Sequence, residues 1–284
     1  MPTELPLNIS VSIVCFDSSE IELRNLITSL VDAVPALKQS FPEVTLSVFL
    51  IDNSVKNCLS LSLFNDLEER MLDRSIDLRL IQGHGNVGFG RGHNLVLNKL
   101  TSSYHLILNP DVQLDADCLL QGIAHFEQHE NIVLESPSAT SADGSKQYLC
   151  KRYPSVLTFL VRGFFPKPWR SLFGNRLAKY EMHDLSEAEP SNNIPIVSGC
   201  FMFCRTAALK SMRGFDEAYF LYFEDFDLSL RMGAVGEIAY VPSMKIRHTG
   251  GHAARKGIAH LRMFARSGIR FFSTHGWRFF RQAG

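Results

Sequence analysis

Short apolar runs rich in β-branched residues alternate with helical patterns in the first eighty residues. Ile9–Phe16, Leu46–Ile51 and Asp77–Ile81 have the length and composition of buried strands. Helical patterns separate them at Glu20–Pro35 and Leu59–Leu72. The order strand, helix, strand, helix, strand predicts a parallel sheet with right-handed crossovers, and therefore an α/β fold.

The first of these helices has a defined start and a defined stop. We expect Ser18 or Ser19 to cap it and Pro35 to end it. Its inward-facing residues should be Ile21, Leu23, Leu26, Ile27, Leu30 and Val34.

Length and composition narrow the class of protein. A chain of 284 residues, 45% apolar and 20% charged, can bury a sizeable core, and without repeats or a linker we expect one domain. The zero net charge gives no general bias toward nucleic acid. The six cysteines lack metal-site spacing and suit buried thiols in a reducing cytoplasm. We see no leader peptide and no apolar run of the ~20 residues that span a bilayer, so we expect a soluble or peripheral protein.

Basic residues without acidic ones occupy two segments, 151–179 and 238–284. Each could face phosphates or be a solvated surface. The tail, 257–281, has a helical pattern with apolar residues on one face and Arg262, Arg266 and Arg270 on another. Such a helix can lie on an anionic membrane or simply dock on the domain, and both interpretations stay open.

Loops after the predicted strands carry polar and glycine residues. Asp17, Asp52 and a glycine-rich loop at 83–94 each follow a strand, so they should meet at one crevice. Glycines allow close approach to a phosphate, although the loop matches neither the Walker nor the dinucleotide pattern and could be only a flexible connection. The strand Tyr104–Leu108 ends in Asn109-Pro110-Asp111, which suits either a metal-bound pyrophosphate or a turn.

A cluster of carboxylates lies among aromatic residues near position 225. Glu224, Asp225 and Asp227 could include a base with a tuned pKa, or could complement the start of a helix, and both can hold at once. Residues 115–129 predict a helix and 138–144 a polar loop. Segment 151–193 predicts aromatic turns around a short helix at 156–162, as an acceptor wall, a lid or a core flap.

Two further strands are expected at 236–241, closed by Pro242, and at 244–248. The second ends in His248, which is either a ligand or a structural residue.

Taken in order, these pieces resemble the family 2 glycosyltransferases, in particular a bacterial rhamnosyltransferase-like branch. The resemblance covers about residues 9 to 252. The matching segments are 11–14, 51–54, 86–90 with Asn94, 108–111, 198–199, 214–217, 222–228, 240–242 and His248.

The resemblance implies a GT-A-type single domain at 1–256, with a mostly parallel central sheet flanked by helices. Its donor-binding half would be about 9–115 and its acceptor and catalytic half about 116–256. A basic amphipathic helical tail would follow at 257–284. The implied reaction moves a sugar from a nucleoside diphosphate with inversion, and Mg²⁺ or Mn²⁺ is the implied cofactor.

Residue roles follow from the same resemblance. Asp225 matches the general base, with Glu224 beside it, and Asp111 and His248 match metal contacts. The donor-binding candidates are Phe16, Asp17, Asp52, Asn86, Gly88, Arg91, Asn94 and Asn109. The acceptor-binding candidates are Ser198, Gly199 and Trp169. The chain departs from the family where Cys15-Phe16-Asp17 replaces Thr-Tyr-Asn and where Asn109 replaces the first metal-motif aspartate.

The implied partners are a dTDP- or UDP-sugar and a lipid-linked or polysaccharide acceptor, with no nucleic acid. We expect dTDP-L-rhamnose as donor and a peripheral position at the cytoplasmic face of the membrane, reached through the tail. Alternatives are a UDP-hexose or UDP-N-acetylhexosamine donor, or a non-catalytic nucleotide-sugar-binding partner of a glycan-assembly complex.

Overall fold

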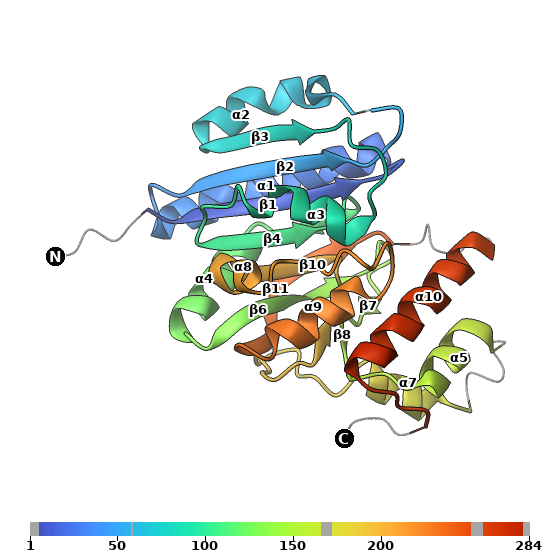
Figure 1. Ribbon diagram of the computed structural model, residues 1–284. Helices are drawn as coiled ribbons and strands as arrows, with labels where there is room; N and C mark the ends of the chain where they lie inside the picture. Colours follow the sequence, from blue (N-terminus) through green and yellow to red (C-terminus); the bar gives the residue numbers. More distant parts are fainter. Residues whose placement is uncertain (1–5, 58, 166–171, 251–257, 281–284) are drawn as a thin grey trace.

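A nine-stranded sheet lies at the centre of the computed structural model, which describes residues 6–57, 59–165, 172–250 and 258–280 (Figure 1). Its strands run in the order β3-β2-β1-β4-β10-β6-β11-β5, and β7 pairs with β6. They are β1 (Asn8–Cys15), β2 (Thr45–Asp52), β3 (Ile76–Ile81), β4 (Tyr104–Leu108), β5 (Val112–Leu114), β6 (Ile132–Thr140), β7 (Lys146–Gln147), β10 (Phe201–Arg205) and β11 (Glu237–His248). A separate pair joins β8 (Cys150–Lys151) to β9 (Ile196–Val197).

The sheet is mostly parallel, as the sequence predicts. Strands β1 to β4 are parallel, β11 is parallel to β6, and β10 and β5 run antiparallel to their neighbours. Cys15 pairs with Asp52 and Ile13 with Leu108, so β1, β2 and β4 end at one edge. Phe201 also pairs with Leu108, which places the start of β10 at the same edge.

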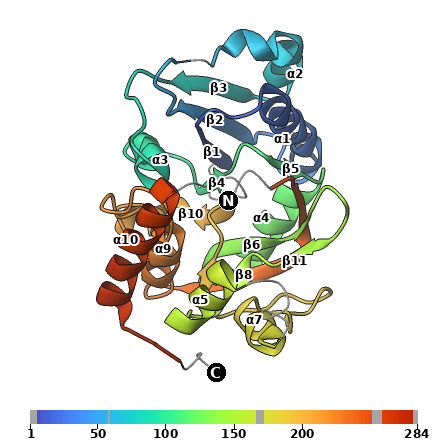
Figure 2. The ribbon, with the colours of Figure 1, turned by 90° about the vertical axis from the view of Figure 1, so that its right-hand side faces the viewer.

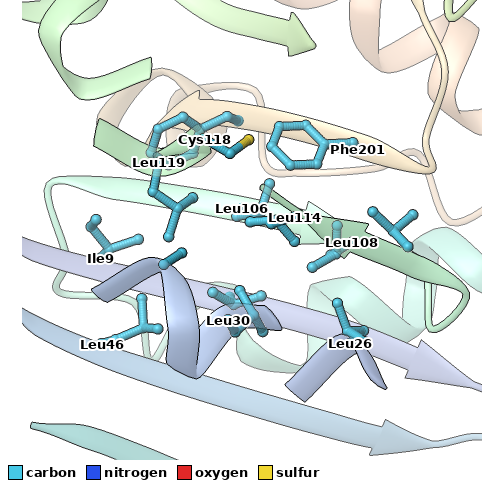
Figure 3. Packing of buried hydrophobic residues seen from close by; sticks show 14 of the residues in the cluster. Ile9, Leu26, Leu30, Leu46, Leu106, Leu108, Leu114, Cys118, Leu119 and Phe201 are labelled. Carbon is cyan, nitrogen blue, oxygen red and sulfur yellow. The ribbon is translucent and has the colours of Figure 1, made fainter. Parts of the chain in front are cut away.

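Helices cover both faces of the sheet (Figure 2). Helices α1 and α4 pack on one face, and α3, α8 and α9 on the other. Figure 3 shows the first layer, where Leu26 and Leu30 of α1 and Leu119 of α4 meet strand residues such as Leu106. The helical elements are α1 (Glu20–Ser40), the 3₁₀ helix η1 (Leu61–Leu67), α2 (Glu68–Asp73), α3 (Phe89–Leu97), α4 (Cys118–Gln128), α5 (Val156–Phe164), α7 (Gly174–Tyr180), α8 (Thr206–Ser211), α9 (Glu224–Met232) and α10 (Ile258–His275).

Helix α1 does not end at Pro35, contrary to the expectation from the sequence. It begins after Ser19, whose side chain accepts from the backbone N–H of Glu22, and continues to Ser40. Proline lacks the N–H that would bond to the carbonyl four residues earlier, that of Val31. The Arg74 guanidinium donates to this carbonyl at 2.6 Å instead, which compensates for the lost bond. The prediction that Ile21 faces inward is wrong: it is 72% exposed, because at about 100° per residue it lies on the side of α1 opposite the buried Leu23 and Leu30.

Three other expectations are corrected in the second half of the sheet. Residues 237–248 form the single strand β11, because an irregularity between Val241 and Lys245 accommodates Pro242 without ending the strand. Strand β6 continues to Thr140, into the predicted polar loop. Helix α4 begins at Cys118 and not at residue 115, because residues 115–117 form a turn in which the N–H of Asp115 still donates to the Lys245 carbonyl of β11.

Helix α10 packs against the rest of the chain. Phe271 and Phe272 are buried in an aromatic cluster with Phe223 and Tyr153. Arg262 and Arg266 of the predicted Arg stripe are exposed together with Leu261 and Ala265, whereas Arg270 pairs with Asp216 of the domain. None of the described helices is long and apolar enough to cross a membrane.

Candidate active site

Two pockets open where the strands end. The β1–α3 pocket, about 540 Å³, is lined by Phe16, Asp17, Asn86, Gly88, Asn109 and Asp111, among others. The α9 pocket, about 490 Å³, is lined by Lys151, Arg162, Ser198, Glu224, Asp225 and His248, among others. They meet where His248 of the α9 pocket lies 3.4 Å from Asp111 of the β1–α3 pocket, measured from Nε2 to Oδ2. One reacting centre can therefore be reached from both.

Asp225 is the second residue of α9 and is held by backbone donors. Its Oδ2 accepts from the N–H of Gly199 at 2.9 Å, and its Oδ1 from the N–H of Phe226 at 3.0 Å. Burial raises the pKa of Asp225, while these two donors and the charge of Lys151 oppose the rise. Gly199 approaches so closely that an added Cβ would lie 3.1 Å from the Cβ of Asp225. The result is a fixed carboxylate with an elevated pKa, as a general base requires.

Glu224 lies beside Asp225 in a different environment. It is only 4% exposed, and its Oε2 makes no hydrogen bond within the described residues. Burial and the nearby charge of Asp225 raise the pKa of Glu224 to about 8. Because the N–H groups of Gly199 and Phe226 stabilise the anion of Asp225, whereas only its own backbone opposes the rise at Glu224, the pair keeps its proton on Glu224 at neutral pH.

The turn before α9 is strained, and α10 holds it. Tyr222 and Phe223 have φ of 72° and 67°, a left-handed conformation that is costly for aromatic residues. The Ser267 hydroxyl donates to the Leu221 carbonyl at 2.8 Å, and the Tyr222 hydroxyl lies 2.9 Å from Nδ1 of His260. The tail helix therefore stabilises the turn that presents the two carboxylates.

The metal candidates Asp111 and His248 are arranged as paired ligands. The Gln147 amide donates to the His248 carbonyl, so its Oε1 must face Nδ1 of His248, 2.7 Å away. Nδ1 therefore carries a hydrogen, and Nε2 is the nitrogen that faces Asp111. Burial opposes ionisation of Asp111, but His248 and backbone donors outweigh it and hold the pKa of that carboxyl below its usual value.

These residues fit a divalent cation in part. Oδ1 of Asp111 is buried and lacks a hydrogen-bond partner within the described residues, so one ligand atom remains for a metal. Among the same residues, no group of three or more His, Cys, Asp or Glu side chains could hold an ion. Such a sparse set suits Mg²⁺ or Mn²⁺ that is also bound by substrate phosphates.

Five donor candidates line the β1–α3 pocket. Phe16 is 51% exposed there, and Asp17, Asn86, Gly88 and Asn109 share the pocket wall. A Cβ on Gly88 would lie 2.4 Å from the carbonyl oxygen of Phe220, so only glycine fits this approach. The glycine-rich loop therefore needs a glycine at position 88, at the wall of the pocket, to pass this close to Phe220.

Three other donor candidates line neither of these two pockets, and their contacts are with the rest of the chain. The carboxylate of Asp52 accepts from the backbone N–H groups of Ser54 and Leu59 and shapes the loop after β2. Arg91 faces outward and pairs with Glu217. Asn94 exchanges hydrogen bonds with the backbone of Phe215.

Of the acceptor candidates, Ser198 lines the α9 pocket and Gly199 contributes its N–H to Asp225. Trp169 lies outside the described residues.

Sequence reasoning missed several pocket residues. His260 and Met263 of α10 line the β1–α3 pocket, although the tail was expected to lie outside the catalytic domain. Lys151 and Arg162 line the α9 pocket, and their signal was the acid-free segment 151–179. Gln147 had no signal, because its partner is 101 residues away.

A model of the family described as Glycosyl transferase family 2 matches residues 10–212. The chain belongs to this family. It is therefore an enzyme, a glycosyltransferase, and the alternative of a non-catalytic nucleotide-sugar-binding partner is set aside.

Its curated relatives are rhamnosyltransferases. N-acetylglucosaminyl-diphospho-decaprenol L-rhamnosyltransferase of Mycobacterium tuberculosis is 27% identical over 234 residues, which cover 72% of this chain and 71% of that protein. Rhamnosyltransferase WbbL of Escherichia coli K12 is 26% identical over 182 residues, 60% of this chain and 64% of that protein. These relatives support the rhamnosyltransferase-like branch.

A solved structure supports the fold. The crystal structure of GalNAc-T7 with UDP, GalNAc and Mn²⁺ is similar with a TM-score of 0.63 at 13% identity. The match covers 95% of this chain and 48% of GalNAc-T7, so the chain spans about half the length of that enzyme. The GT-A-type α/β fold is confirmed, whereas the boundaries of the donor half, acceptor half and tail stay predictions.

Proposed function

We propose that this glycosyltransferase moves L-rhamnose from dTDP-L-rhamnose to a lipid-linked acceptor in cell-surface glycan synthesis, with inversion. The observation that carries the mechanism is the Asp225 carboxylate, fixed by the Gly199 N–H in a pocket that meets the Asp111 side of a second pocket. The M. tuberculosis and E. coli relatives support the rhamnosyl donor, and the diphospho-decaprenol in the name of the former supports a lipid-linked acceptor over a free polysaccharide.

In this mechanism the donor occupies the β1–α3 pocket and the acceptor hydroxyl lies at Asp225. Asp225 takes the proton of this hydroxyl while the acceptor oxygen attacks the anomeric carbon of the donor sugar. The nucleoside diphosphate leaves from the opposite side of that carbon. Glu224 keeps its own proton and limits the negative charge beside the base. Asp111 and His248 would hold a divalent cation, Mg²⁺ or Mn²⁺, which stabilises negative charge on the departing phosphates when bound.

Thermal unfolding with a nucleotide panel tests the donor. A ligand at ~100 times its dissociation constant adds about 2.7 kcal/mol to the free energy of unfolding, which shifts a melting curve measurably. With Mg²⁺ or Mn²⁺ present, we expect dTDP and dTDP-rhamnose to raise the melting temperature more than UDP or GDP. If no nucleotide changed the melting temperature of the folded protein, the result would contradict the proposal.

A UDP-hexose or UDP-N-acetylhexosamine donor is the second candidate. Its support is the structural neighbour that contains UDP and GalNAc. A selective response to UDP in the same panel would keep the fold and the base but change the donor.

We also propose that the enzyme works as a peripheral protein at the cytoplasmic membrane face, with α10 as the contact. The outward surface of α10 combines apolar Ile258, Leu261 and Ile269 with exposed Arg262 and Arg266. No acidic residue occurs between positions 238 and 284, which favours attraction to anionic lipid.

A further inference from the structure

Two cations line the same pocket as the base. Lys151 is the last residue of β8, and its side chain is 8% exposed. Arg162 of α5 lines the same pocket. Both belong to the acid-free segment 151–179. In contrast, the neighbouring Arg152 forms a two-pronged pair with Asp184 on the surface.

The two cations share one carboxylate. Lys151 Nζ and Arg162 Nε each lie 3.7 Å from the same oxygen, Oε1 of Glu181. This separation is longer than the ~2.7–2.9 Å of a direct charge-assisted hydrogen bond. Burial lowers the pKa of Lys151 to about 8, although Glu181 opposes the shift, and the ammonium group also donates to the Tyr148 carbonyl. A ligand with more negative charge than Glu181 alone would be stabilised there.

A sugar linked to a lipid through a diphosphate meets this requirement. Its acceptor hydroxyl and its diphosphate are on one sugar ring, so with the hydroxyl at Asp225 the first phosphate lies only the width of a sugar ring away. The pocket of about 490 Å³ holds Asp225 and both cations, and Phe159 and Phe264 give it an apolar wall. We infer that Lys151 and Arg162 bind the diphosphate of the lipid-linked acceptor, a role that rests on the proposed function.

Binding of farnesyl diphosphate tests this directly, without transfer. The titration uses the full chain saturated with dTDP and Mg²⁺, so that the donor diphosphate site is filled, and farnesol is the probe without phosphates. Loss of one charge-assisted contact should weaken farnesyl diphosphate binding roughly 10- to 100-fold in Lys151→Gln and in Arg162→Gln. Arg152→Gln, from the same segment but outside the pocket, should bind like the wild type, and farnesol should bind all four proteins equally.

If the Lys151 variant does not fold, the Arg162 variant still tests the inference. The Arg162 side chain is 49% exposed, so its replacement should not prevent folding. Unchanged farnesyl diphosphate binding in Arg162→Gln would overturn the inference. So would a loss of dTDP affinity with farnesyl diphosphate unaffected, because the cations would then serve the donor.

Steady-state transfer separates this inference from the proposed function. Two acceptors with the same N-acetylglucosamine and lipid, joined with and without a diphosphate, are compared. We expect the variants to raise KM for the diphosphate acceptor about 10-fold or more while kcat changes little. If the wild type uses neither acceptor but its farnesyl diphosphate binding still depends on Arg162, the proposed acceptor fails and the cation site stands.

Discussion

The three acids that begin α9 have three different surroundings. Asp225 accepts two backbone hydrogen bonds, Glu224 has an unpartnered oxygen within the described residues, and Asp227 pairs with Arg231 and His275. These acids are therefore compatible with both interpretations, a base in a pocket and acids that complement a helix start. Asp227 supports the scaffold, and Glu224 and Asp225 face the pocket.

Replacing the base tests its assignment. Asp225→Asn keeps an oxygen that can accept from Gly199 but cannot take a proton, so kcat should fall by about 10²- to 10⁴-fold. Affinity for dTDP, measured by calorimetry, should not change, because Asp225 does not line the β1–α3 pocket. The surface variant Asp184→Asn is the control. Turnover near the wild-type rate in Asp225→Asn would remove the base assignment.

The proton on Glu224 predicts a pH dependence of stability. The pKa rises from an ordinary value of 4.5 to about 8 in the folded protein, so the folded state binds this proton more tightly than the unfolded chain does. This stabilisation is fully present below about 4.5 and is lost as the pH rises through about 8. The melting temperature should therefore decrease more between pH 6 and 9 in the wild type than in Glu224→Gln. Exposed Glu189→Gln should follow the wild type, and identical slopes for all three would contradict the protonated state.

Gln147 predicts an effect on metal affinity through His248. Gln147→Leu removes the acceptor that places the hydrogen on Nδ1, and loss of such an outer partner typically weakens metal binding about 10- to 100-fold. Calorimetric titration of Mn²⁺ in the presence of dTDP measures this. Exposed Gln128→Leu is the control. Equal Mn²⁺ affinity in Gln147→Leu and the wild type would exclude this role.

At the scale of elements, α10 acts on the turn that begins α9. Gly268 lets the two approach, since an added Cβ would lie 3.2 Å from the ring of Phe223. The bulkier Gly268→Val should displace Phe223 and with it Glu224 and Asp225. We expect kcat to fall at least 10-fold, as small displacements of catalytic groups can cost about 10²-fold.

Ala265→Val is the matched variant, because it places the same side chain on an exposed position of the same helix and lowers helix propensity there, which Gly268→Val does not. It should retain wild-type kcat. If both variants lose activity equally, the effect comes from the helix and not from the turn.

The elements themselves show what the sequence can predict. Strands β1, β2 and β4 were readable because each is a short, β-branched apolar run with clear boundaries. The prolines Pro35 and Pro242 gave wrong predictions of where a helix and a strand end. The guanidinium of Arg74 accommodates Pro35 within α1, and a strand irregularity accommodates Pro242 within β11. Asp111, Asn86 and Asp225 were predicted as site residues and each lines one of the two pockets, while their roles stay predictions. Contacts made by residues far apart in the chain, such as Gln147 with His248, leave no local pattern.

At the scale of the whole molecule, both pockets open against one helix. His260 and Met263 line the β1–α3 pocket and Phe264 lines the α9 pocket. The opposite side of α10 carries exposed arginines and apolar residues. A membrane that contacts this outer side would place a lipid-linked acceptor next to the base without a separate anchor.

Vesicle binding tests this arrangement. Each basic residue near an anionic surface contributes about 1 kcal/mol, so Arg262→Gln with Arg266→Gln should weaken binding by about 2 kcal/mol, roughly 30-fold. Cosedimentation with vesicles containing phosphatidylglycerol should show this loss, and neutral phosphatidylcholine vesicles should bind both proteins weakly. Arg79→Gln is the control, because Arg79 lies on β3, away from α10, and pairs with Asp77. Since neither α10 arginine lines a pocket, transfer to a short, water-soluble acceptor should be retained by the double variant. Equal binding of the double variant and the wild type to anionic vesicles would show that α10 serves the active site alone.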